Sequence, residues 1–113
     1  MTFVKDTCSA FLEIYKSDDF FGEVTNIGMN SEVSIGQLAK EIMKIMNVAL
    51  LIVNDQMRER PKNSEVERLY CNNKKLFNGS SWQPEYDLKQ GLLETIKWFQ
   101  KNNQTYKAEH YHI

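Results

Sequence analysis

Three stretches of the chain place apolar residues at the three- and four-residue steps of an amphipathic helix. The first covers residues 6 to 17, and Asp6 is in position to cap it. The second starts at Ser34, which forms a capping-box pattern with Gln37, and Asn47 is its expected end. The third follows Asp87, a helix-capping residue. The predicted apolar faces are Cys8, Phe11, Leu12 and Tyr15; Ile35, Leu38, Ile42 and Ile45; and Leu88, Leu92, Ile96 and Phe99.

Two shorter stretches have the pattern of β-strands. In Glu23–Gly28, EVTNIG, Val24 alternates with polar neighbours and the glycine ends the run. Ala49–Val53, ALLIV, is a continuous apolar run, short enough for a strand covered on both faces. The order strand, helix, strand predicts an α/β fold, in which about three helices flank a small, parallel sheet of roughly two or three strands. Such a small sheet also predicts a need for a partner surface.

Composition narrows the class of protein. The chain has 113 residues and a formal net charge of −1, which suits one domain and disfavours a dedicated nucleic-acid partner. No apolar run has the length of a membrane span, and the first residues lack a signal-peptide pattern. We therefore expect a cytoplasmic protein without a membrane partner. The expected organisation is one unit over residues 1–102 and a flexible polar tail over residues 103–113.

The familiar patterns of catalytic and metal sites are missing. The chain contains no GxSxG, GxxxxGK[ST] or HExxH pattern, and its five glycines are scattered. Cys8 and Cys71 lie outside any CxxC pattern and are expected to be reduced thiols. His110 and His112 form an HxH pair that belongs to the expected tail. We therefore predict no catalytic, cofactor-binding or metal-binding residue.

One pair of residues matches a catalytic pattern formally. Tyr70 and Lys74 fit YxxxK, the pair that short-chain dehydrogenases place one helical turn apart beside a nicotinamide. Two asparagines lie between them, and no dinucleotide-binding pattern precedes them. Because a two-residue pattern is a weak motif, we interpret this match as chance.

The segment Met57–Leu69, MRERPKNSEVERL, is the strongest candidate for a binding site. Seven of its thirteen residues are charged, with both signs present. Arg58 and Arg60 carry planar guanidinium groups that suit two phosphate oxygens, and Glu65 can accept hydrogen bonds from two vicinal sugar hydroxyls. The alternative is a solvated loop whose charges pair among themselves, each pair contributing little to stability. Spacing alone favours this alternative.

Several motifs occur in the order found in one family. The chain resembles the C-terminal portion of the extended short-chain dehydrogenase/reductases, the NAD-dependent nucleotide-sugar epimerases and 4,6-dehydratases. The resemblance covers residues 2 to about 102. One departure is GSSWQP, which is two residues longer than the family's GWxP. The motifs are TFVKD (2–6), NIG (26–28), SIGQLAKEI (34–42), RPKNSEVERL (60–69), NNKK (72–75), WQP (82–84) and GLLETIKWF (91–99).

The resemblance implies a role for the charged segment. In the family this region builds the substrate-binding subdomain, so Arg60 would contact the pyrophosphate and Glu65 the nucleotide ribose. Arg58 could substitute for Arg60. The family's cofactor loop and catalytic Tyr/Lys pair are not among these residues, so NAD is implied for full-length relatives and not for this chain.

Two hypotheses follow from different classes of function. In the first, the chain is the substrate-binding part of a nucleotide-sugar 4,6-dehydratase or epimerase in carbohydrate biosynthesis, and has no turnover by itself. Its ligand is then a nucleoside-diphosphate sugar, and its protein partner the family's Rossmann domain. In the second, the chain is a stand-alone interaction module that keeps the fold without the ligand and associates with itself or another protein.

Overall fold

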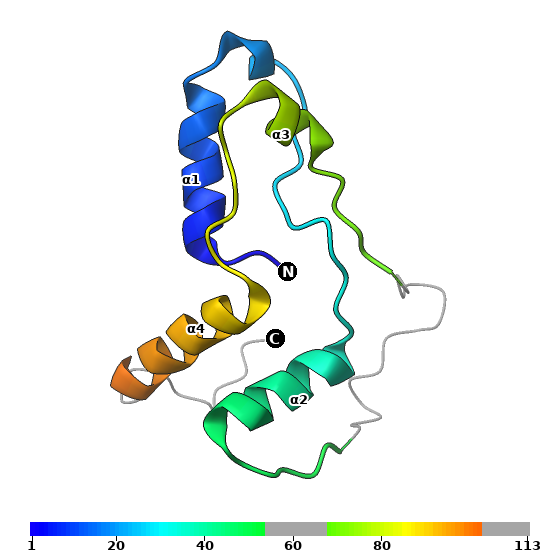
Figure 1. The fold of residues 1–113 in the computed structure, drawn as a ribbon, viewed down its shortest axis with the longest axis vertical. Helices are drawn as coiled ribbons and strands as arrows, with labels where there is room; N and C mark the ends of the chain where they lie inside the picture. Colours follow the sequence, from blue (N-terminus) through cyan, green and yellow to red (C-terminus); the bar gives the residue numbers. More distant parts are fainter. Residues whose placement is uncertain (54–67, 103–113) are drawn as a thin grey trace, which may run out of the picture.

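A computed structural model describes residues 1–53 and 68–102 of the chain (Figure 1). Within these ranges the secondary structure is helical. The elements in order are α1 (Val4–Tyr15), the short 3₁₀ helix η1 (Asp18–Phe20), α2 (Ile35–Met46), α3 (Lys74–Gly79) and α4 (Leu88–Asn102). The expected tail, residues 103–113, lies outside the described ranges.

The predicted α/β fold is wrong, because the described residues contain no β-strand and hence no sheet. The run Ala49–Val53 lacks secondary structure, and every residue in it is exposed. Leu51, expected to be covered on both faces, is 89% exposed. A strand exists only where a neighbouring backbone accepts its hydrogen bonds, and apolar composition by itself does not supply that neighbour.

The other predicted strand, Glu23–Gly28, does have a neighbour. It lies beside Asn72 and Asn73, but the hydrogen bonds to these two residues run through asparagine side chains. The amide of Asn73 donates to the main-chain oxygen of Gly28 at 2.6 Å, and that of Asn26 donates to the oxygen of Asn72 at 3.5 Å. The two segments are therefore adjacent without the backbone ladder that defines a sheet.

The local helix signals give the expected ends for α2. The Ser34 hydroxyl accepts the N–H of Gln37 at 3.1 Å, and the Gln37 side chain accepts the N–H of Ser34 at 3.0 Å. This is the predicted capping box. Asn47 ends α2, as predicted from the sequence, and the structure shows that it does so in the left-handed conformation, with φ of 53°.

The third predicted helix is also present, as α4. The carboxylate of Asp87 accepts the N–H of Gln90 at 2.7 Å, and the Gln90 side chain accepts the N–H of Asp87 at 2.8 Å. For α1 the predicted cap is wrong: the helix follows Phe3, without a side-chain cap, and Asp6 is buried inside its first turn. The reason is tertiary, since the Asp6 carboxylate accepts the N–H of Glu85, 79 residues away, at 2.9 Å.

A small core lies between α1, η1, α3 and the segment that leads from α3 to α4. This segment runs back along α1 (Figure 1). The aromatic rings of Trp82 and Phe77 meet edge to face at 5.6 Å within the core region. By contrast, α2 has no buried residue. The buried apolar residues are Ala10, Phe20, Leu76 and Trp82, with Ile14 and Ile27 packed against them.

Candidate functional site

The three predicted ligand-binding residues, Arg58, Arg60 and Glu65, fall within residues 54–67 and lie outside the described part of the chain. The structure describes the residues on either side. Val53 ends the exposed apolar run on one side, and Arg68 follows the segment on the other. The geometry around Arg68 therefore gives the surroundings of one end of the predicted site.

Arg68 forms a bidentate contact with Glu32. Its Nη2 lies 2.5 Å from one Glu32 oxygen, and its Nε lies 3.2 and 3.3 Å from the two oxygens. The hydrogen bond to Glu32, followed by the charge of that carboxylate, raises the pKa of Arg68. The side chain of Arg68 is 79% exposed, so this pair positions the chain more than it stabilises the fold.

A solvent-open hollow of about 560 Å³ lies beside this ion pair. Arg68 borders it on one side, and the start of α2, with Ser34 and Gln37, borders it on the other. A volume of this order lies within the usual range for small-molecule sites. The capping box occupies amides at the start of α2. Arg68 is the positively charged side chain in the lining, and it is paired there with Glu32.

Two motifs of the family resemblance, NIG and NNKK, lie against each other close to Arg68. A Cβ atom added to Gly28, in NIG, would lie 2.6 Å from the sulfur of Cys71, just before NNKK. The N–H of Asn73, in NNKK, donates to the side-chain oxygen of Asn30 at 3.2 Å. Asn73 is 2% exposed, so these bonds are shielded from water. The chain directly after Arg68 is thereby fixed to the segment directly before α2.

Next to this junction is a hollow of about 310 Å³. Its lining includes Thr2, Asn26, Ser31 and Tyr70, together with a glycine and a cysteine. The lining offers hydroxyl and amide groups and no charged side chain. Such a lining suits neutral hydroxyl-bearing groups better than phosphates.

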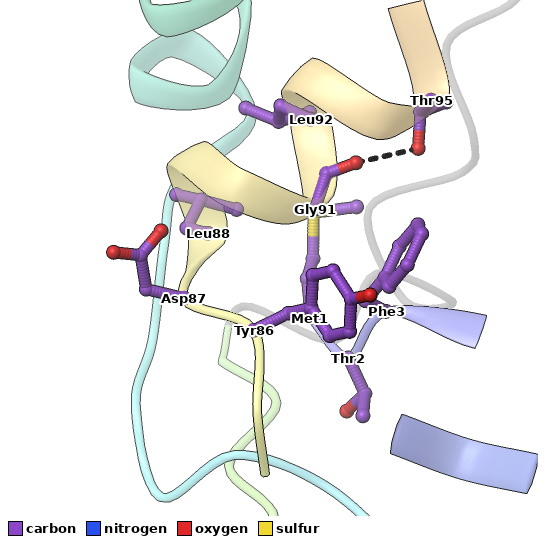
Figure 2. Close-up of a pocket in the computed structure, with 9 residues that line it drawn as sticks. All are labelled: Met1, Thr2, Phe3, Tyr86, Asp87, Leu88, Gly91, Leu92 and Thr95. Carbon is purple, nitrogen blue, oxygen red and sulfur yellow. Dashed lines mark hydrogen bonds between the residues drawn. The ribbon is translucent and has the colours of Figure 1, made fainter. Parts of the chain in front are cut away.

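The third hollow lies where the first residues meet the start of α4 (Figure 2). The rings of Phe3 and Tyr86 lie 4.6 Å apart, and Gly91 admits Phe3 because a Cβ there would approach its ring to 3.3 Å. The Thr95 hydroxyl donates to the oxygen of Gly91 at 2.8 Å. At about 70 Å³ this space is too small for a nucleotide sugar. We interpret it as a packing joint between the first residues and α4.

Other site types find no support in the described residues. Tyr70 lies in an irregular segment and Lys74 is the first residue of α3, so they are not one helical turn apart. Among residues 1–53 and 68–102, no three His, Cys, Asp or Glu side chains gather as metal ligands. In the part of the chain that the structure describes, no helix is both long enough and apolar enough to cross a bilayer.

Comparison with known proteins gives three informative relatives. The human dTDP-D-glucose 4,6-dehydratase is 32% identical over 110 residues, covering 93% of this chain and 30% of that protein. A putative UDP-glucose 4-epimerase of Methanocaldococcus jannaschii is 31% identical over 83 residues, 74% of this chain and 26% of that protein. A probable GDP-L-fucose synthase 1 of Oryza sativa subsp. japonica is 31% identical over 90 residues, covering 79% of this chain and 26% of that protein. No family model matches the chain, and no solved structure matches it significantly.

These relatives define the class as the nucleotide-sugar dehydratases and epimerases of the extended short-chain dehydrogenase/reductase family. This chain is a homologue of a part of those proteins, and the resemblance predicted from its motifs is confirmed. It spans about 30% of the length of the human dehydratase.

The sequence interpretation missed several residues around the predicted site. Glu32 positions Arg68. The hydrogen bond between Asn73 and Asn30 joins NNKK, which follows the charged segment, to the chain just after NIG, which precedes it. Each contact links residues more than 30 positions apart. Local periodicity carries no signal for such contacts. The only available hint was that NIG and NNKK belong to one family pattern.

Proposed function

We propose that this chain is the part of a nucleotide-sugar 4,6-dehydratase or epimerase that binds the nucleoside-diphosphate sugar. The observation that carries the proposal is the extent of the match, since 93% of the chain aligns with a protein named dTDP-D-glucose 4,6-dehydratase. The relatives named as a UDP-glucose epimerase and a GDP-L-fucose synthase also have nucleotide sugars in their names. A nucleoside-diphosphate sugar is therefore the ligand class that all three have in common.

The charged segment supplies the proposed contacts. Arg60 binds the pyrophosphate, with Arg58 as a second guanidinium group in reach, and Glu65 accepts hydrogen bonds from the ribose hydroxyls. The described residues support this assignment indirectly. The Arg68–Glu32 ion pair holds the chain just after the segment beside the hollow at the start of α2. Because the Glu32 carboxylate offsets the charge of Arg68 there, the proposed phosphate contacts depend on the guanidinium groups of Arg58 and Arg60.

The chain's own residues do not fit NAD. Dinucleotide sites need a glycine-rich turn that leads into a helix with open N-terminal amides. The five glycines here are scattered, and the capping box occupies amides at the start of α2. We propose that NAD belongs to the longer relatives, that this chain has no turnover by itself, and that it acts in the cytoplasm.

The test is an amide NMR titration of the full chain with UDP-glucose, dTDP-glucose and GDP-mannose. Saturable shifts are expected in residues 58 to 69, and the ligand of highest affinity identifies the base. Arg60→Ala should weaken binding by about tenfold or more, the effect of losing a charge-assisted hydrogen bond. Lys40→Ala, on the exposed side of α2, is the matched control and should leave affinity unchanged. Absence of saturable shifts with all three ligands would rule out the proposal.

A specific observation also favours the second function, protein association. Large apolar side chains on one face of α1 are exposed, among them Tyr15 at 90% and Leu12 at 63%. A single exposed apolar residue is ordinary, but a continuous face of them indicates a docking surface. Association and nucleotide-sugar binding use different parts of the chain and are compatible.

A further inference from the structure

Helix α1 is apolar on two opposite faces. Its inner face carries Ala10 and Ile14, which pack in the core. Its outer face carries a stripe of exposed side chains at steps of four, three and four residues. This spacing is the seam that helices use to pack against another helix. The stripe, called here the α1 seam, consists of Val4, Cys8, Phe11 and Tyr15, with Leu12 beside it.

The C-terminal end of α1 carries an acidic and aromatic tip. Asp18 and Asp19 lie in η1, directly beyond the helix, and Phe21 follows with 91% of its side chain exposed. Neither aspartate has an ion pair among the described residues. The neighbouring lysine, Lys16, is already paired with Glu13. We call Asp18, Asp19 and Phe21 the acidic tip.

The N-terminal end of α1 carries the opposite charge. A hollow of about 540 Å³ separates the start of α1 from the second half of α4. Trp98, 57% exposed, gives it an apolar surface. Lys97 is paired with Glu94, Lys5 lies 5.6 Å from the ring of Tyr86, and no contact within the described residues holds Lys101. This basic groove is lined by Phe3, Val4, Lys5, Glu94, Thr95, Lys97, Trp98 and Lys101.

Figure 1 shows η1 beyond one end of α1 and α4 across the other end. The 12 residues of α1 separate the acidic tip from the basic groove by roughly 18 Å, the length of the helix. The apolar seam joins the two. From one end of α1 to the other, the exposed side chains are therefore acidic at η1, apolar along the helix and basic at the groove.

We propose that a second copy of this chain covers this surface, with the two α1 helices antiparallel. A two-fold axis near the middle of the seam, close to Cys8 and Phe11, brings each acidic tip to the basic groove of the other copy. Such an interface is isologous, so it closes on itself and produces a dimer. A parallel arrangement would bring like charges together at both ends and is disfavoured for that reason.

The two kinds of contact have separate roles in this dimer. Burial of the seam supplies most of the affinity, because removal of apolar surface from water drives association. The charged ends set the direction of pairing and the rate of encounter. Phe21 and Trp98 place an aromatic ring at each charged end, so the ends also exclude water.

The test is analytical ultracentrifugation of the full chain from micromolar to millimolar concentration, with two charge-reversed variants. Asp18→Lys with Asp19→Lys makes the tip basic, and Lys5→Glu with Lys101→Glu makes the groove acidic. Each variant alone should dimerise about tenfold or more weakly, because like charges then face each other twice. An equimolar mixture of the two should recover the dimer, since both contacts become attractive again.

The mixing experiment needs a control for simple attraction between oppositely charged proteins. Lys40→Glu with Lys44→Glu produces the same net charge as the groove variant but on the exposed side of α2. Mixed with the tip variant, it should not recover the dimer. Phe11→Glu, at the centre of the seam, should abolish association in every combination. Circular dichroism checks that each variant remains folded.

Two outcomes would overturn the proposal. One is a native chain that stays monomeric at millimolar concentration, which would leave another polypeptide as the occupant of the seam. The other is a dimer that is indifferent to all charge reversals and to Phe11→Glu. The NMR titration with nucleotide sugars tests residues far from the seam in sequence, so its result is independent of the result on dimerisation.

Discussion

The indole N–H of Trp82 donates to the main-chain oxygen of Asp6 at 3.1 Å, across 76 residues of sequence. The same N–H lies 3.0 Å from the hydroxyl of Ser9, and the carboxylate of Asp6 accepts the N–H of Glu85. Trp82 and Asp6 are both almost completely buried, so water competes little for these bonds. This joint connects α1 to the segment that leads into α4 without any backbone pairing.

Replacement of Trp82 should show how much this joint contributes. Trp82→Phe keeps an aromatic ring but removes the N–H, so the oxygen of Asp6 keeps the Ser9 hydroxyl as donor and loses the indole. The free energy of unfolding should fall by about 0.5–1.5 kcal/mol, the contribution of one hydrogen bond. Trp82→Ala also leaves a cavity and should lower it by about 3–5 kcal/mol. Urea denaturation followed by circular dichroism measures both. Tyr70→Phe, at a 59% exposed position, is the control, and a Trp82→Phe variant as stable as this control would refute the role of the bond.

Two glycines should respond in opposite directions to alanine. At Gly28 a Cβ would lie 2.6 Å from the sulfur of Cys71, so Gly28→Ala forces the two motifs apart and should cost about 1–3 kcal/mol of stability. At Gly36, inside α2, a Cβ meets nothing within 4 Å, so Gly36→Ala should stabilise by about 0.5–1 kcal/mol. Thermal denaturation of both variants measures these two changes in stability. Equal shifts of the same sign would show that NIG and NNKK do not pack closely.

Sequence patterns predict the fold well where the determinants are local. The capping box of Ser34 and Gln37, the end of α2 at Asn47 and the start of α4 after Asp87 all depend on neighbours within four residues. The strand predictions fail because a strand depends on a second segment. Ala49–Val53 has the composition of a buried strand, yet the described residues provide no backbone to pair with it.

The candidate site, like the fold, has features that the sequence predicts and features that it does not. Guanidinium and carboxylate groups at Arg58, Arg60 and Glu65 indicate the chemistry of a phosphate and ribose clasp, but spacing alone favoured a solvated loop. The family resemblance, now confirmed, changed that balance. The Arg68–Glu32 pair could not be found from periodicity, because the two residues are separated by 36 positions.

Glu32 should influence ligand binding without contacting the ligand. Glu32→Gln keeps a hydrogen-bond acceptor but removes the charge that holds Arg68, so the chain after the charged segment is less well positioned. Affinity for the best nucleotide sugar should fall by about two- to fivefold, consistent with loss of one exposed ion pair. Isothermal titration calorimetry measures the change. Added salt should lower the affinity of the native chain toward that of the variant. An unchanged affinity in Glu32→Gln would exclude a positioning role.

The last prediction concerns acid stability and α4. Lys97 donates to Glu94 at 3.0 Å, and this hydrogen bond, followed by the charge of Lys97, lowers the pKa of Glu94 below its usual 4.5. A carboxyl whose pKa is lower in the folded state contributes stability that is fully present above about pH 4.5. That contribution is lost as the pH falls through the lowered pKa.

Melting temperatures measured by circular dichroism between neutral and acidic pH, at a concentration where the chain is monomeric, test this sign. The native chain should melt slightly higher than Glu94→Gln at neutral pH, and the difference should shrink as the pH falls below about 4.5. Because both side chains are exposed, about 1 M salt should remove most of the difference. In the Lys97→Gln background, the pH-dependent effect of Glu94→Gln should be much smaller, because the weaker influence of Lys5 is then the remaining charge that lowers the pKa of Glu94. A difference that grows toward acid pH would contradict the assigned ion pair.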